Sequence, residues 1–176
     1  MCRRWREAVS AAHLWSWVSL TALPGNLHTI PAALTLPRLA AINTFHLSVV
    51  SSQLLKAVAE HKGLRKLVMI ETKLTEVSAN LLAQVVVNKR EVNLGASDLT
   101  DQQVKAIVEA VKPNSPLSKL TLKSVNLSSV KVNSLPQLLT PLQELNVCNC
   151  QLRPSQVNDI KYNQILSGNF QQKSWE

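Results

Sequence analysis

At 176 residues, with 45% hydrophobic and 17% charged residues, the chain is long enough for one domain with a sizeable core and is not intrinsically disordered. Its net charge of +8 is dispersed in small clusters with no block of five or six like charges, which favours a solvated basic surface over nucleic-acid binding. Three cysteines do not make a disulfide framework, and no stretch approaches the about 20 apolar residues of a membrane span. We therefore expect a reducing location, cytoplasmic or else nuclear.

Residues 1–20 differ in composition from the rest of the chain, because three of the four tryptophans lie in the first 17 residues. Trp5, Val9 and Ala12 have helical spacing and predict a short amphipathic cap. The apolar residues just before residue 20 have the spacing of a strand, and the prolines and glycine after it favour a loop. We therefore divide the chain into a helical cap with a first strand, residues 1–20, and a second unit, residues 21–176.

The apolar residues of the second unit repeat. One ladder of apolar residues is followed, five residues later in every case, by a ladder of leucines, and both advance in steps of 27, 25, 28 and 25 residues. A shared rhythm of this length predicts a stack of about five similar units. The first ladder is Ile42, Met69, Leu94, Leu122 and Val147, and the second is Leu47, Leu74, Leu99, Leu127 and Leu152.

Each unit is expected to contain a short strand followed by a helix. The third unit has the clearest helix, since Thr100 is an N-cap and Gln103 completes a capping box. In the first unit we expect a helix from Ser52 to His61, and in the fourth Pro136 predicts a short or broken helix. The parallel strands are expected near Leu67–Met69, Val92–Leu94, Leu120–Leu122 and Leu145–Val147.

The strand segments resemble the leucine-rich-repeat pattern LxxLxLxx(N/C/T)xL, and repeats of this length are similar to the ribonuclease-inhibitor-like class. The resemblance implies an α/β leucine-rich-repeat horseshoe, with parallel strands on the concave face, helices on the convex face and the short N-terminal helical cap at one end. In this family the side chain at the eighth position satisfies backbone groups in the turn after the strand. Thr72, Ser97 and Cys150 are suited to that role, and we expect the pattern to be interrupted at Phe45 and Val125.

The residues before the first strand resemble the second half of an F-box, the helical module that binds the adaptor of cullin–RING ubiquitin ligases. The family pattern there is roughly C-[RK]-x-W-[RK], a short gap and then L-W. The matching residues, which the resemblance implies would contact the adaptor, are Cys2, Arg3, Trp5, Arg6, Leu14 and Trp15. The first half of an F-box does not precede them, so adaptor binding is expected only if the module is completed upstream. A generic cap over the end of the repeat stack is the alternative.

In parallel strands of this kind, the residues that flank the core leucines face the concave side. They mix both charges with apolar and amide groups, and a curved repeat array offers such a surface to a protein partner. The residues expected to bind the partner are Lys66, Val68, Ile70, Glu91, Asn93, Lys119, Thr121, Lys123, Glu144 and Asn146. Ala41, Asn43, Gly95 and Cys148 are expected to continue the same face.

No group of residues in the sequence has the spacing of a catalytic or metal site. The four histidines are isolated, and four glycines leave no room for a phosphate-binding loop. We therefore expect no enzymatic activity, no cofactor and no metal. The chain is predicted to be a protein-binding module, the substrate-recognition subunit of an F-box-type ubiquitin ligase that holds its target on the concave face. The alternative is a leucine-rich-repeat scaffold, or an innate-sensor-like fragment, without a ligase role.

Overall fold

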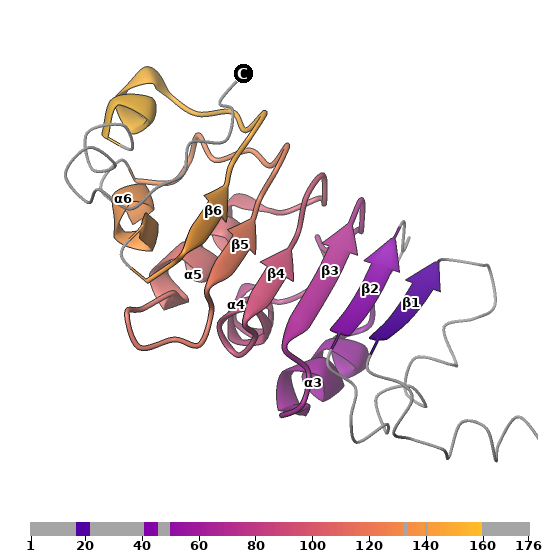
Figure 1. The fold of residues 1–176 in the computed structure, drawn as a ribbon. Coiled ribbons are helices and arrows are strands. Elements are labelled where there is room, and N and C mark those ends of the chain that lie inside the picture. Colours follow the sequence, from indigo (N-terminus) through magenta and orange to yellow (C-terminus); the bar gives the residue numbers. More distant parts are fainter. Residues whose placement is uncertain (1–16, 22–40, 46–49, 132–133, 140, 160–176) are drawn as a thin grey trace, which may run out of the picture.

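The computed structural model describes residues 17–21, 41–45, 50–131, 134–139 and 141–159. Within these segments six parallel strands form one sheet, and their spatial order is their order in the chain (Figure 1). The strands are β1 (Trp17–Thr21), β2 (Ala41–Phe45), β3 (Lys66–Ile70), β4 (Glu91–Asn93), β5 (Lys119–Thr121) and β6 (Glu144–Asn146). The helices are α3 (Ser52–Glu60), α4 (Ala79–Val87), α5 (Asp101–Ala110) and α6 (Ser134–Leu139). The expected N-terminal cap and all six F-box-like residues lie outside the described segments.

The architecture is α/β, with α3, α4, α5 and α6 on one side of the sheet (Figure 1). Parallel neighbours require the chain to return from the end of one strand to the start of the next, and α3 to α6 make that return. β1, which the composition groups with the N-terminal segment, pairs with β2 and is the first strand of the same sheet. None of the helices in the described segments is long and apolar enough to cross a bilayer.

The core lies between the sheet and the helices, as the alternation of apolar residues predicts. Every strand from β3 to β6 lies within one residue of its predicted position. The helices bury one stripe each, which on α5 includes Val104, Ile107 and Val108. The buried strand residues and the residues that directly follow them are Leu67, Met69, Val92, Leu94, Leu120, Leu122, Leu145 and Val147.

The predicted helix limits are also confirmed. In α5 the Thr100 side chain accepts a hydrogen bond from the Gln103 backbone N–H, and the Gln103 side chain accepts one from the Thr100 backbone N–H. α3 ends at Glu60 with His61 as its C-cap. α6 has only six residues, which confirms the short helix expected there, and Pro136 lies in its first turn, where the missing N–H of proline costs no intrahelical hydrogen bond.

The predicted register of the first unit is wrong by two residues. The ladder equates Ile42 with Met69, but Ile42 pairs with Leu67 and Thr44 pairs with Met69. Side chains alternate with a period of two, so a two-residue shift keeps Ile42 on the same side of the sheet, and an apolar pattern does not distinguish the two registers. Phe45 consequently pairs with Ile70 and does not occupy the eighth position of the repeat. The interruption expected at Phe45 is therefore wrong, and the equivalent position lies outside the described segments.

The turns after the strands use the eighth-position side chains as predicted. The Ser97 hydroxyl donates to the Met69 carbonyl over 2.8 Å, and the Cys150 thiol donates to the Leu122 carbonyl over 2.9 Å. These are the same contact made in two different units. Thr72 donates to the carbonyl two residues before it over 3.1 Å. Val125 is buried and has no side-chain donor, so the interruption expected at this position is confirmed.

The residue before each eighth position has a left-handed backbone conformation. The φ angles are 52° at Glu71, 54° at Ala96, 60° at Ser124 and 55° at Asn149. A non-glycine residue with a Cβ costs about 1–2 kcal/mol in this region, and asparagine suffers least. The turns of four units thus have the same backbone geometry and the same strain.

Replacing Ala96 by glycine is expected to raise the free energy of unfolding by about 0.5–1 kcal/mol, because glycine adopts a positive φ without a steric penalty. Urea unfolding followed by circular dichroism measures the change. The matched control is Ala106→Gly within α5, which is expected to lower stability by about 1 kcal/mol. Destabilisation by both substitutions would contradict the left-handed turn.

One leucine position of the repeat is occupied by a buried lysine. Lys89 stands where the neighbouring units have Leu64, Leu117 and Leu142, two residues before the strand, and it is 1% exposed. Its ammonium group donates to the His61 carbonyl at the end of α3 over 3.2 Å. Burial lowers the pKa of Lys89 below its ordinary value, because the charged form has lost its hydration.

We expect Lys89→Leu to stabilise the protein by about 1–3 kcal/mol at pH 7, since it restores an apolar core residue and removes a buried charge. The lowered pKa of Lys89 means that the folded state binds fewer protons than the unfolded state as the pH rises towards 10.5. The wild-type protein should therefore gain stability over this range, and its deficit relative to the variant should shrink. Urea titrations at several pH values test this, with the exposed Lys105→Leu as the control. A deficit that stays constant with pH would contradict the lowered pKa.

Candidate binding surface on the sheet

The face of the sheet turned away from the helices collects the residues expected to bind a partner. We call it the open face. Lys66, Val68, Glu91, Asn93, Lys119, Thr121, Glu144 and Asn146 lie on it, in two rows that run across β3 to β6. Ile70 continues the face at the end of β3, and Lys123 lies in the turn after β5. Sequence periodicity alone places these ten residues on one side, and the register of the sheet places them next to one another.

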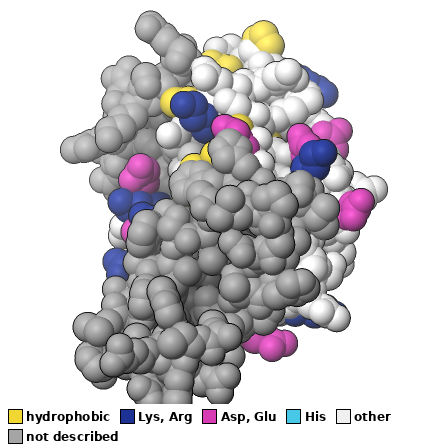
Figure 2. Space-filling view, turned by 90° about the vertical axis from the view of Figure 1, so that its right-hand side faces the viewer, with side chains coloured by type: hydrophobic (Ala, Val, Ile, Leu, Met, Phe, Trp, Pro, Cys, Tyr) yellow, Lys and Arg dark blue, Asp and Glu magenta, His cyan; other side chains and the backbone are white. Residues whose placement is uncertain are grey.

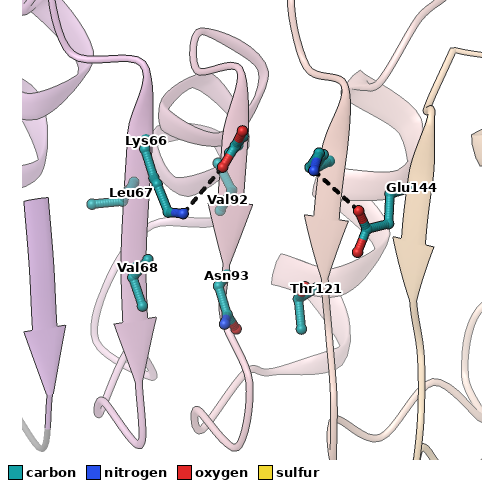
Figure 3. A pocket seen from close by; sticks show the side chains of 9 residues that line it. Lys66, Leu67, Val68, Val92, Asn93, Thr121 and Glu144 are labelled. Atoms are coloured by element: carbon teal, nitrogen blue, oxygen red, sulfur yellow. Dashed lines mark ion pairs between the residues drawn. The ribbon is translucent and has the colours of Figure 1, made fainter. Parts of the chain in front are cut away.

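The first row is an alternating line of charges. The register aligns Lys66, Glu91, Lys119 and Glu144 on four neighbouring strands. The ammonium group of Lys66 lies 3.2 Å from the Glu91 carboxylate, and that of Lys119 lies 3.2 Å from the Glu144 carboxylate (Figure 3). Between 34% and 53% of each of these side chains is exposed, so the pairs contribute little to stability. They remain accessible to a partner.

The second row consists of Val68, Asn93, Thr121 and Asn146. Two of these side chains have structural tasks. The Asn93 side-chain oxygen accepts a hydrogen bond from the Gly95 N–H over 2.9 Å, and the Asn146 oxygen accepts one from the Cys148 N–H over 3.1 Å. Each asparagine thereby starts the turn after its strand. Val68 is only 8% exposed and adds little to the surface of this row. The accessible surface of the row therefore comes mostly from Thr121 and the two asparagine side chains, which are partly exposed.

The two rows enclose a shallow hollow of about 240 Å³. Its floor includes the backbone of Leu67 and Val92, whose side chains point away from the hollow, and its walls are the ion pairs on either side of the gap between β4 and β5 (Figure 3). No nucleophile faces a general base among the residues that line it. The hollow offers four charged groups, one amide and one hydroxyl, which are groups suited to polar recognition.

The Cys150 thiol lies in the turn beside this surface and is partly buried. Burial raises the pKa of Cys150, and its thiol donates to the Leu122 carbonyl, so the neutral form is held in the turn. Within the described segments no group of three or more His, Cys, Asp or Glu side chains is arranged to bind a metal ion.

Comparison with known proteins supports the fold. No protein-family model and no curated protein matches the chain. A solved structure, the C-terminal domain of a Caenorhabditis elegans tropomodulin, superposes with a TM-score of 0.54 at 12% identity, covering 76% of this chain and 90% of that one. The fold is leucine-rich-repeat-like. At this identity the likeness extends to the fold and not to function.

The sequence analysis missed the role of two glutamines. Gln103 and Gln156 are buried, and the side-chain amide of each donates to two backbone carbonyls of the preceding unit. Gln103 is recognisable as a capping residue, but its second contact joins positions 26 and 29 residues apart. The recurrence of glutamine at equivalent positions of two units was the available signal.

Proposed function

We propose that the chain is a protein-binding module in which the open face is the concave surface of a leucine-rich-repeat horseshoe and holds a protein partner. The observation that carries this proposal is the accessibility of seven polar side chains, arranged with the buried Val68 in two rows across four strands, on the face that the helices leave uncovered (Figure 3). A sheet face that served only stability would have no need of two accessible ion pairs, since such pairs contribute about 0–1 kcal/mol each.

The size and chemistry of the hollow favour a macromolecule over a small ligand. Pockets for small molecules are typically concave and mostly apolar, with volumes of about 300–1,000 Å³. This hollow is smaller and open, and charged and amide side chains line it. A protein surface can contact the hollow and the flanking ion pairs together, and its own charged side chains can exchange partners with Lys66, Glu91, Lys119 and Glu144.

We further propose that the module is the substrate-recognition subunit of an F-box-type ubiquitin ligase. The support is the match of Cys2, Arg3, Trp5 and Arg6, followed by Leu14-Trp15, to the second half of an F-box. In this role the open face would hold the target and the N-terminal segment would attach to the adaptor. The chain itself would carry none of the transfer chemistry. A scaffold without a ligase role would use the same face.

The open face is tested by placing a bulky charge in the hollow. Thr121→Arg should abolish the specific association of proteins recovered on the immobilised chain, because the side chain of Thr121 lines the hollow. The matched control is Gln84→Arg, which adds the same charge on an exposed position of α4. Quantitative mass spectrometry compares the recovered proteins, and circular dichroism confirms that both variants fold. If Thr121→Arg recovers the same proteins as the parent, the open face is not the binding surface.

Adaptor attachment is tested separately by co-purification of the longest natural form of the protein with the cullin–RING adaptor. The adaptor should be recovered with the parent and lost with Leu14→Ala/Trp15→Ala. Failure to recover the adaptor with the parent would remove the ligase role and leave the binding-module proposal unaffected.

A further inference from the structure

A third row of residues lies directly before the strands β3 to β6 begin. We call Arg65, Arg90, Ser118 and Gln143 the rim row. At each step the backbone carbonyl of one member accepts a hydrogen bond from the backbone N–H of the next, and the distance is 2.8 Å at all three steps. The four residues therefore occupy the same place in successive units, directly before the charged row of the open face.

The rim row carries uncompensated positive charge. Arg65 and Arg90 are exposed, and neither forms an ion pair with another residue of the described segments. The nearby acid Glu91 is already paired with Lys66. Neighbouring strands lie about 4.8 Å apart, and like charges directly opposite one another are destabilising. Two arginines side by side are therefore an arrangement that folding alone does not favour.

The charge of the rim is confined to one end. Ser118 and Gln143 are neutral, and the Ser118 hydroxyl donates to the Arg90 carbonyl over 3.1 Å. Lys62, exposed in the turn before β3, adds a third cation at the end where the arginines lie. The inner charged row is neutral as a whole, because each lysine is paired with a glutamate. Within the rim row, the net positive charge is thus concentrated next to β3 and β4.

We propose that this end of the rim binds an acidic polypeptide segment of the protein held on the open face, with Arg65 and Arg90 contacting its carboxylates. The inference rests on the proposed function and specifies the chemistry of the partner. Arginine binds carboxylates in a bidentate manner, and two guanidinium groups on adjacent strands suit two acidic side chains of one segment. Binding would also relieve the repulsion between the arginines.

A polypeptide fits this site better than a nucleic acid. β3 to β6 carry no aromatic residue on which a base would stack. The rim lies directly beside the carboxylates of Glu91 and Glu144, which would repel a continuous phosphate backbone. On the side of the molecule seen in Figure 2, acidic and basic side chains of the described residues lie near one another.

The test measures the affinity of the whole chain for a fluorescein-labelled octaglutamate peptide by fluorescence anisotropy at low salt. The parent should bind, and Arg65→Gln/Arg90→Gln should weaken the affinity on the order of tenfold or more. The control Lys105→Gln/Lys112→Gln removes the same charge at exposed positions of α5 and the residues after it, and should change the affinity by less than about twofold. Arg65→Lys/Arg90→Lys should give an intermediate affinity, since charge is kept and bidentate geometry is lost.

Thermal unfolding of the same variants separates binding from structure. Arg65→Gln/Arg90→Gln should be as stable as the parent or slightly more stable, because a like-charge contact is removed. The proposal is overturned if octaglutamate does not bind, if the control pair weakens binding equally, or if a single-stranded RNA 12-mer binds more tightly through the same arginines. A failure of octaglutamate to bind would overturn the rim proposal alone. The effect of Thr121→Arg on the recovered proteins tests the open face separately, so the two proposals can be rejected independently.

Discussion

Replacing Leu94 by alanine is expected to lower the free energy of unfolding by about 2–5 kcal/mol, the largest change among the substitutions proposed for this protein. Leu94 is 0% exposed and follows β4 in the ladder between Met69 and Leu122. Its side chain lies in a core that every unit contributes to, so truncation leaves a cavity that neighbouring units fill only in part. A domain of this kind has about 5–15 kcal/mol of stability, and the loss is a large share of it.

Urea unfolding of Leu94→Ala, followed by circular dichroism, gives the midpoint of the transition and the slope of the free energy of unfolding against urea concentration. Because each unit contacts only its neighbours, weakening a central unit should also reduce the cooperativity of unfolding, which appears as a smaller slope. The control is Leu81→Ala, a leucine on α4 that is half-buried, with an expected loss of about 1 kcal/mol. If Leu81→Ala and Leu94→Ala lower the free energy of unfolding equally, Leu94 is no more deeply buried than the half-buried Leu81, and the ladder does not mark the core.

The second large effect is expected from Gln103→Ala, at about 2–4 kcal/mol of destabilisation. Gln103 is 1% exposed, and its side-chain amide donates to the Leu74 carbonyl over 2.5 Å and the Val77 carbonyl over 2.6 Å. Its side-chain oxygen accepts from the Thr100 N–H over 2.8 Å. Alanine would leave three buried or half-buried backbone groups without this partner, in two units that the side chain now joins. Gln102→Ala, at an exposed neighbouring position, should cost no more than about 0.5 kcal/mol.

Gln103→Glu gives a sharper reading of the same contact. A carboxylate would face two carbonyl oxygens, so the variant should be at least as unstable as Gln103→Ala at pH 7. Burial next to two carbonyl oxygens, with the Thr100 N–H as a donor on one side only, would raise the pKa of the new carboxyl above its unfolded value near 4.3, so the folded state would bind the extra proton more readily. The stability of Gln103→Glu relative to the parent should therefore improve as the pH falls through the raised pKa. A pH-independent deficit would indicate that the amide does not bridge the two units.

Local sequence patterns predict some contacts of a residue and not others. Thr100 and Gln103 mark the start of α5 in the sequence, because a capping box involves residues only three apart. The contact of Gln103 with Leu74 spans 29 residues and has no local signature. Ile42 shows the opposite failure: the apolar alternation predicts its register wrongly, because a shift of two residues leaves the alternation unchanged.

The candidate surface divides in the same way. Lys66, Glu91, Lys119 and Glu144 are predictable as residues of one face, since each directly precedes a core position of its strand. Their pairing into two ion pairs depends on which strands lie side by side and in what register. The rim arginines were not recognised as a pair because Arg65 and Arg90 belong to different units, and only the backbone hydrogen bonds between units bring them together.

For the described segments from β3 onwards, the sequence by itself determined the strands and helices and the side of each that is buried. Those properties follow from residues two to four positions apart, through the periods of strands and helices and the chemistry of caps. The tertiary structure decided the register of β2, the partners of the charged row, the burial of Lys89 in a leucine position and the adjacency of Arg65 and Arg90. These depend on contacts between residues about 25–29 apart, whose alignment is set by the length of the intervening loop and helix rather than by any local pattern.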